Sequence, residues 1–170
     1  MEQVAARPNR IPWPPLLYGA ALGLGIALGR LSPLGWPQEP AGGALRMAGG
    51  ALAVLGLALD LWSLATLHRA RTNILPHRAA ERLVTHGPYG LSRNPIYLGN
   101  TLLVLGLGAV FANGWIMAAA LGAALATDRL AARREEAHLA ARFGADFSAY
   151  RARVPRWIGR PRGQQSSWKR

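Results

Sequence analysis

Four long apolar stretches divide the chain, and most basic residues lie before the first stretch, between the second and third, and after the fourth. The stretches cover residues 15–31, 44–67, 96–111 and 115–127. A helix that crosses a bilayer needs about 20 predominantly apolar residues, with a range of roughly 17–25. The second stretch reaches this length by itself. The last two are shorter, but Asn113-Gly114 between them is a turn signal, which predicts a tight hairpin of two helices.

The pattern predicts an all-α integral membrane protein with about four transmembrane helices and a C-terminal cytoplasmic amphipathic helical segment. The expected spans are about 15–31, 45–67, 95–111 and 114–130. A soluble bundle with a buried hairpin is the alternative, but a soluble domain of 170 residues rarely hides four helices so poor in charge. We expect a single domain over residues 1–160 and a disordered tail over residues 161–170.

Charge orients these spans. The 20 basic residues outnumber the 8 acidic ones and give a net charge of +12, which alone would suggest a nucleic-acid-binding protein. However, 18 of the 20 lie in the N-terminal segment, the segment between the second and third spans, and the C-terminal tail. Four spans place these three segments on one side, which the positive-inside rule makes the cytoplasm. We therefore expect both termini in the cytoplasm, the inner membrane if the source is bacterial, lipid headgroups as partners of the tail, and no nucleic acid.

Several smaller features bear on this topology. No cleavable signal peptide is evident, so the first span should remain in the mature protein. Tryptophans mark the expected span ends, namely Trp13, Trp36 and Trp115. Two glycine pairs in the first span, Gly19/Gly23 and Gly25/Gly29, have the spacing of close helix packing in lipid. The chain has no cysteine, which excludes disulfides and thiol chemistry, and its four histidines show no spacing that would suggest a metal site.

The first segment with possible chemistry covers residues 81–99, ERLVTHGPYGLSRNPIYLG. Asn94-Pro95 predicts a helix N-cap followed by proline at the first helical position. Such a helix start carries free N–H groups and a positive dipole end, which suit a carboxylate or phosphate. Arg93 adds a positive charge, and Tyr89 and Tyr97 add aromatic faces. The alternative is an ordinary capped helix with interfacial tyrosines.

The second segment covers residues 133–155, RREEAHLAARFGADFSAYRARVP. Its larger apolar residues recur every three or four positions: Leu139, Phe143, Phe147, Tyr150 and Val154. This spacing predicts a pair of amphipathic helices broken near Gly144 and packed on the membrane face. Glu135 and Glu136 are adjacent acids in a basic tail. On charge alone, they could simply pair at i, i+4 spacing with nearby arginines, for instance Arg129, Arg133 or Arg134.

The same two segments carry a family resemblance. LVTHGPYGLSRNPIYLG resembles the LVT-x-G-x-Y…RHP-x-Y-x-G motif of isoprenylcysteine carboxyl methyltransferases, and REEAHLAARFGADFSAYRARVPRWI resembles the EE…FG-x-x-Y-x-x-Y…VP ending of that family. Related motifs occur in phospholipid N-methyltransferases. The similarity covers about residues 72–158, with both motifs in order around a helical hairpin.

The resemblance implies an integral membrane methyltransferase that uses S-adenosyl-L-methionine on a lipophilic small molecule or a lipidated substrate at the cytoplasmic membrane face. Phospholipid or amine N-methylation is the alternative within the enzymes, and a non-catalytic membrane scaffold or sensing protein is the alternative outside them. No catalytic residue is assigned. By motif position, the resemblance implies cofactor contacts at Leu83, Val84, Tyr89, Asn94, Pro95, Tyr97, Glu135 and Glu136.

The chemistry of the cofactor agrees with these residue types. The helix start at Asn94-Pro95 suits its carboxylate, Glu135 suits its ammonium, and tyrosine faces suit its sulfonium. Asn94 stands where the family has histidine, and asparagine cannot titrate near neutral pH.

The roles of two kinds of polar residue stay open at this point. The arginine expected to bind a substrate carboxylate could be Arg129, Arg133 or Arg134. Asp60 lies inside the second span, near its cytoplasmic end. It is either a functional intramembrane acid or a helix-end acid that reaches interfacial water.

Overall fold

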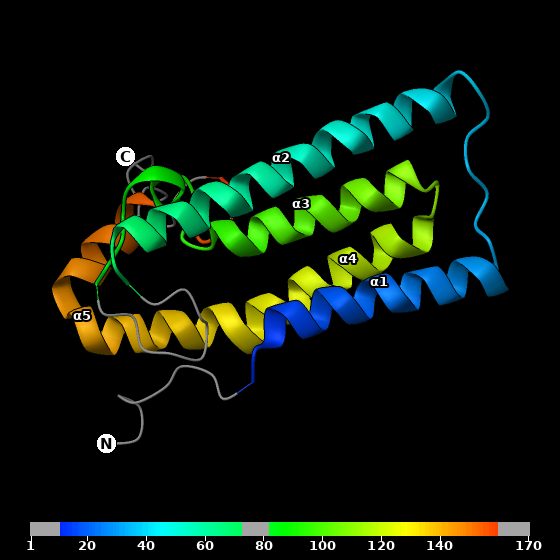
Figure 1. Ribbon diagram of the computed structural model, residues 1–170. Coiled ribbons are helices and arrows are strands. Elements are labelled where there is room, and N and C mark those ends of the chain that lie inside the picture. Colours follow the sequence, from blue (N-terminus) through cyan, green and yellow to red (C-terminus); the bar gives the residue numbers. More distant parts are fainter. Residues whose placement is uncertain (1–10, 73–81, 160–170) are drawn as a thin grey trace, which may run out of the picture.

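The computed structural model describes residues 11–72 and 82–159, and all the regular structure in these ranges is helical. Figure 1 shows how these helices are arranged. The elements are α1 (Trp13–Leu31), α2 (Ala41–Arg69), the 3-10 turn η2 (Gly87–Gly90), α3 (Pro95–Val110), α4 (Gly114–Thr127), the π-helical turn η3 (Asp128–Ala132) and α5 (Arg133–Arg153). The all-α prediction is therefore confirmed, whereas the predicted disordered tail lies outside the described residues.

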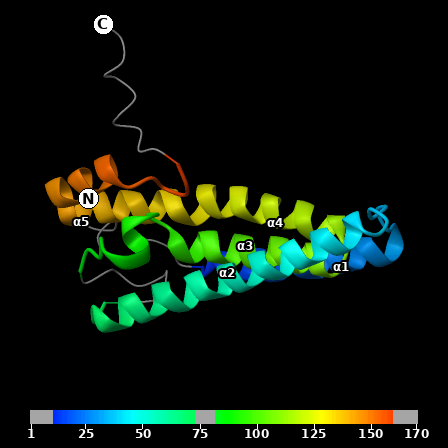
Figure 2. The ribbon, with the colours of Figure 1, turned by 90° about the horizontal axis from the view of Figure 1, so that it is seen from above.

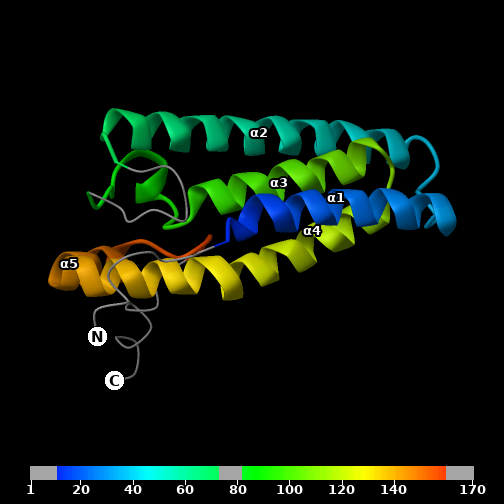
Figure 3. The same ribbon diagram turned by 60° about the horizontal axis from the view of Figure 1, so that its bottom comes forward.

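The four helices α1 to α4 run alternately up and down the bundle. Helix α2 packs on α3, α1 packs on α4, and contacts between α3 and α4 join the two pairs (Figures 1 and 3). The start of α1, the end of α2, the start of α3 and the end of α4 consequently meet at one end, beside η2 and α5. This end of the bundle holds both segments that the sequence singled out.

The lengths of the helices agree with a multi-pass membrane protein. Helices α1 and α2, and the continuous helix Gly114–Arg153, are long and apolar enough to cross a membrane. Helix α3 has 16 residues, or about 24 Å, and is shorter than the roughly 30 Å hydrocarbon core. The fourth span was expected to end near residue 130. The helix does not stop there, because the π-helical residues of η3 continue α4 directly into α5.

Glycines let α2 and α3 approach until their backbones touch. A Cβ atom added to Gly56 would lie 2.6 Å from the carbonyl oxygen of Gly99, and one added to Gly106 would lie 2.5 Å from that of Gly49. Both distances are far below van der Waals contact, so neither position accepts a side chain without moving the helices. Each helix thus presents two small residues seven positions apart, as in close-packed membrane helices.

The α1–α4 pair uses one of the two predicted glycine pairs. Gly25 lies against the backbone of Ile116, and Gly29 lies against the side chain of Asn113, so this pair is confirmed. Outside its own helix backbone, a Cβ atom added to Gly19 or Gly23 would meet no described atom within 4 Å, so the predicted packing role of these two glycines is wrong for residues 11–72 and 82–159. The reason is rotation around the helix: the pairs lie six residues apart, which turns them toward different sides.

Asn113 closes the hairpin between α3 and α4, as its turn signal predicted. Its side-chain oxygen accepts hydrogen bonds from the backbone N–H groups of Trp115 and Ile116, at 3.0 and 3.2 Å. Its side-chain nitrogen donates to the carbonyl of Gly25, at 3.1 Å. One residue therefore caps α4 and fastens the hairpin to α1.

Candidate functional site

The loop before α3 is fastened to α5. Its turn η2 begins at Gly87, whose φ of +61° is unfavourable for residues with a side chain. The Tyr150 hydroxyl of α5 donates to the carbonyl oxygen of Tyr89 in η2, at 2.6 Å. Tyr89 is thereby held at the end of the bundle where the two sequence motifs meet.

Helix α5 is broken at Gly144, as predicted. This residue has φ 50° and ψ −115°, a backbone conformation outside the helical region. Figure 2 shows the chain turning back toward the bundle beyond the break, in orange to red. The apolar face of the second half is buried against Leu83, with Phe147 and Tyr150 at its centre. The prediction that this face packs on the membrane is therefore wrong, because the loop before α3 covers it.

The segment after α5 lies over the start of α3. The backbone N–H of Arg93 donates to the carbonyl of Pro155 at 2.9 Å, and the Ser92 hydroxyl donates to that of Arg156 at 3.0 Å. Asn94 occupies the predicted N-cap position, but its side chain makes no capping bond and donates instead to the carbonyl of Arg156, at 3.1 Å. The first turn of α3 therefore begins without a side-chain cap.

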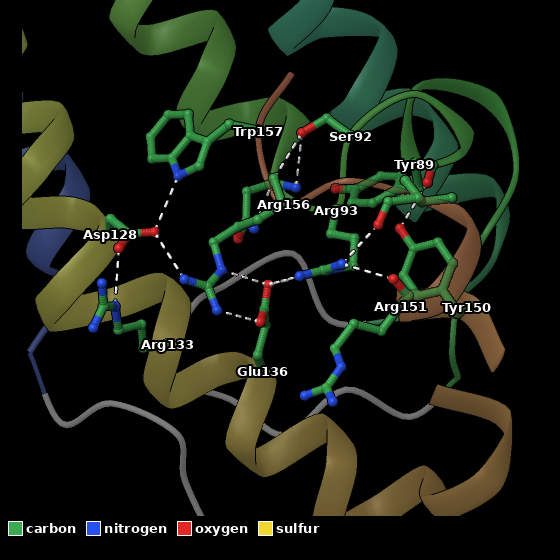
Figure 4. Close-up of polar contacts among 12 residues, drawn as sticks. Tyr89, Ser92, Arg93, Asp128, Arg133, Glu136, Tyr150, Arg151, Arg156 and Trp157 are labelled. Atoms are coloured by element: carbon green, nitrogen blue, oxygen red, sulfur yellow. Dashed lines mark hydrogen bonds and ion pairs between the residues drawn. The ribbon is translucent and has the colours of Figure 1, made fainter. Parts of the chain in front are cut away.

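Figure 4 shows a set of ion pairs that we call the arginine–acid network: Arg93, Asp128, Arg133, Glu136 and Arg156. Glu136 is at its centre. It accepts from Nη2 of Arg93 at 3.0 Å and from Nη2 of Arg156 at 2.7 Å, and the side chains of Glu136 and Arg93 are only 8% and 9% exposed. Charges this deeply buried must be paired. The network thus joins α5, the loop before α3 and the segment after α5.

Asp128 is the second acid of the network. It accepts hydrogen bonds from Arg133 at 2.9 Å, Arg156 at 3.2 Å and the indole N–H of Trp157 at 3.1 Å.

Glu136 also has a perturbed pKa. Burial alone would raise this pKa, but the hydrogen bonds of Glu136 and the neighbouring arginines outweigh burial and lower it. Glu136 is therefore ionised at neutral pH, and both acids are fully engaged by partners within the chain.

Glu135, the adjacent acid, has a different environment. The Tyr97 hydroxyl of α3 donates to its Oε1 atom at 2.6 Å, and we call these two residues the tyrosine–glutamate pair. Burial raises the pKa of Glu135 to about 7; the hydrogen bond from Tyr97 opposes this rise, and repulsion from Glu136 adds to it. Within residues 11–72 and 82–159, no basic side chain forms an ion pair with Glu135. This carboxyl can therefore accept a cation.

Tyr89 lies close to the tyrosine–glutamate pair. Its pKa is raised mainly by burial and then by the negative charges of Tyr150, Glu135 and Asp60, so its hydroxyl is in electrostatic range of all three groups. The phenol of Tyr89 consequently stays neutral at physiological pH.

The structure brings some of the predicted site residues together and separates others. Tyr97 and Glu135 are in direct contact, and Tyr89 is near them. Asn94 and Pro95 form the start of α3. Leu83 packs on the core of α5, and Val84 is buried in the same loop. Glu136 belongs to the arginine–acid network and has no free oxygen.

The predicted arginine partners need correction. Pairing of Glu136 with an arginine of its own helix is wrong, since Arg93 and Arg156 hold it from other parts of the chain. Of the three candidates for a substrate-binding arginine, Arg133 pairs with Asp128, and Arg129 and Arg134 are exposed.

Sequence reasoning also missed one residue of the site. Arg156 binds both acids of the arginine–acid network. Its position directly after Val154-Pro155, inside the quoted motif, was the available signal. Elsewhere in the described ranges, no three His, Asp or Glu side chains gather as they would around a metal ion.

Comparison with known proteins agrees with this arrangement. The phospholipid methyltransferase family model matches residues 45–146. The nickel-cobalt-cadmium resistance protein NccN of Alcaligenes xylosoxydans xylosoxydans is 37% identical over 83 residues, which are 49% of this chain and 38% of that protein. The cobalt-zinc-cadmium resistance protein CzcN of Cupriavidus metallidurans is 36% identical over 99 residues, 58% of this chain and 45% of that protein. The chain thus matches less than half the length of either relative.

A solved structure shares the fold. The eukaryotic intramembrane Ras methyltransferase ICMT, an isoprenylcysteine carboxyl methyltransferase, superposes with a TM-score of 0.59 at 22% identity, over 86% of this chain and 52% of that one. An identity this low shows the fold only, whereas the family match covers more than half of this chain. The chain therefore belongs to the phospholipid methyltransferase family, as a multi-pass membrane protein of the methyltransferase kind.

Proposed function

We propose that the protein transfers a methyl group from S-adenosyl-L-methionine to a lipophilic substrate at the cytoplasmic face of the membrane. One observation carries the proposal: among the described residues the carboxyl of Glu135 has a tyrosine hydroxyl as partner but no ion pair, whereas Glu136 next to it is neutralised by two arginines. A partly buried carboxyl without a basic partner is costly unless a cationic ligand occupies the site.

The residues of the site fit the charged groups of this cofactor. Glu135 would hold the ammonium, and the uncapped first turn of α3 would receive the carboxylate. The rings of Tyr89 and Tyr97 would stabilise the sulfonium by cation–π attraction, worth about 0.5–2 kcal/mol. When bound, the cofactor supplies an already activated methyl group. The chain then has only to hold the acceptor in line and exclude water.

The distribution of charge supports a cytoplasmic site. Arginines crowd the end of the bundle that holds the site, among them Arg69, Arg71, Arg82, Arg129 and Arg134. The opposite end carries Arg30 and Arg46, and Arg46 pairs with Glu39 at 3.7 Å. The positive-inside rule assigns the arginine-rich end to the cytoplasm, which is the inner face of the cytoplasmic membrane if the source is bacterial.

Cofactor binding tests the proposal directly. Isothermal titration of detergent-purified protein with S-adenosylmethionine should show saturable binding, and Glu135→Gln should weaken it at least tenfold, or about 1.4 kcal/mol. Asp146→Asn, which removes an exposed acid from the same helix, should bind like the wild type. Absence of binding by the wild type would refute the proposal and favour a non-catalytic membrane scaffold. Unchanged affinity in Glu135→Gln would remove Glu135 from the site.

A further inference from the structure

Asp60 is an acid inside a membrane-spanning helix that the cofactor site does not use. It lies nine residues before the end of α2 at Arg69, which places it about 14 Å from that end. Its Oδ1 atom is buried and has no hydrogen-bond partner among residues 11–72 and 82–159. The interpretation as a helix-end acid that reaches interfacial water therefore does not fit this oxygen.

The carboxyl group faces α3 rather than lipid. Asp60 lies four residues after Gly56 and three before Ser63, and both of these residues are buried on the α3 side of α2. Leu57 and Leu61, on the outward side, are about half exposed. Gly99 of α3 leaves the space that Oδ1 occupies, since a Cβ atom at Gly99 would collide with it. The two helices therefore form a niche around an unpaired acid.

This niche adjoins the proposed cofactor site. Turn η2 packs on α2, where Gly87 approaches the side chains of Thr66 and Trp62. Tyr89, in the same turn, is within electrostatic range of both Asp60 and Glu135. Within the part of the chain that the structure describes, Glu135 has a hydrogen-bond donor, the Tyr97 hydroxyl, whereas Oδ1 of Asp60 has none.

We propose that Asp60 is an acceptor-binding residue whose carboxylate takes the proton-bearing nitrogen of a lipophilic amine; this rests on the proposed methyltransferase function. An acid in hydrocarbon without a partner is costly, and an ammonium group removes that cost by charge and hydrogen bonding. A carboxylate acceptor would instead meet Asp60 as a like charge, in surroundings that screen it poorly.

The same contact prepares the nitrogen for methylation. An ammonium group has no lone pair and cannot act as a nucleophile. When one N–H bond breaks, the proton forms an O–H bond on Asp60 and the electron pair remains on nitrogen. The result is a neutral amine beside a neutral acid, with total charge unchanged. Asp60 therefore both binds the acceptor and converts it to its reactive form.

Binding of simple amphiphiles in lipid nanodiscs tests this assignment. Dodecylamine should bind to the wild type and dodecanoic acid should not. Asp60→Asn should weaken dodecylamine binding at least tenfold, keep S-adenosylmethionine affinity within twofold, and abolish transfer of radiolabelled methyl to dodecylamine. The control Asp146→Asn should leave all three properties unchanged. Equal dodecylamine binding by wild type and Asp60→Asn, or preferential binding of dodecanoic acid, would overturn the assignment.

A second measurement uses the wild-type chain alone, in case the variant fails to fold. A hydrophobic carbodiimide reacts with carboxyl groups inside membranes, and mass spectrometry should find the adduct on Asp60. N,N-Dimethyldodecylamine, a tertiary amine that cannot form an amide with the activated carboxyl, should protect Asp60 from the reagent, whereas methyl dodecanoate should not; equal labelling with and without the amine would refute the contact. Neither this readout nor amine binding requires S-adenosylmethionine. If cofactor binding fails while the amine still protects Asp60, the proposed function falls and the amine site stands.

Discussion

The arginine–acid network and the tyrosine–glutamate pair lie side by side, yet they treat the two adjacent glutamates in opposite ways. Glu136 accepts bonds from two arginines and has a lowered pKa, so it is charged at neutral pH and both of its oxygens are engaged. Glu135 accepts one tyrosine hydroxyl and has a pKa raised to about 7. The difference teaches that the network holds the end of the bundle together, while the pair leaves a charge available for a ligand.

The largest expected effect comes from removing the carboxylate of Glu136, the central acid of the arginine–acid network. Glu136→Ala leaves the buried guanidinium of Arg93 without a counter-charge, which costs about 3–5 kcal/mol. At about 2–4 °C per kcal/mol for a chain of this size, Tm should fall by about 6 °C or more. Differential scanning fluorimetry in detergent measures it. Glu135→Ala is the matched control, and an equal loss of Tm in both variants would show that the two glutamates have the same role.

A change of pH around 7 should alter the ionisation of the tyrosine–glutamate pair and leave that of the arginine–acid network unchanged. The pKa of Glu135 is raised, so this carboxyl gains its charge only as pH rises through about 7. A cationic ligand needs that charge, and S-adenosylmethionine affinity should therefore fall about tenfold between pH 8 and pH 6. Isothermal titration across this range checks the slope. Residual affinity of Glu135→Gln should not follow this titration; a variant with the same slope would assign the titration to another group.

Removing the phenol of the pair should have a moderate effect. Tyr97→Phe deletes the hydrogen bond to Glu135 and keeps the aromatic ring. A hydrogen bond of this kind is worth about 1 kcal/mol, so cofactor affinity should fall roughly fivefold, with little change in Tm. The pH midpoint of binding should also rise, because the bond favours the charged form of Glu135. A midpoint that stays in place or falls would contradict this link.

The smallest expected effect is on the attachment of η2. Tyr150→Phe removes the hydrogen bond from its hydroxyl to the carbonyl of Tyr89, which is only partly buried and can be hydrated instead. We expect a loss of about 0.5 kcal/mol in stability, or about 1–2 °C of Tm. Because the bond positions Tyr89, cofactor affinity should fall by no more than about twofold. A tenfold loss of affinity would make Tyr150 part of the site itself.

Much of the fold followed from local features of the sequence. The four apolar stretches all form helices, Asn113 closes the predicted hairpin, and Gly144 breaks α5 at the predicted place. These outcomes depend on residues close together in the chain, where composition and turn chemistry are decisive. The packing of Gly19 and Gly23 could not be predicted in the same way, because it depends on which side of α1 meets its neighbour.

The candidate site also combines features that depend on the local sequence with features that depend on helix packing. The sequence alone determined the helical membrane architecture, the uneven distribution of charge along the chain, and the two motifs that supply Tyr97 and Glu135. Only the tertiary structure decided that Glu136 belongs to Arg93 and Arg156, and that Oδ1 of Asp60 faces Gly99 with no hydrogen-bond partner in the described part of the chain. The physical reason is separation along the chain. An ion pair that joins residues 43 positions apart, as Arg93 and Glu136 are, exists only once the helices that carry them have packed.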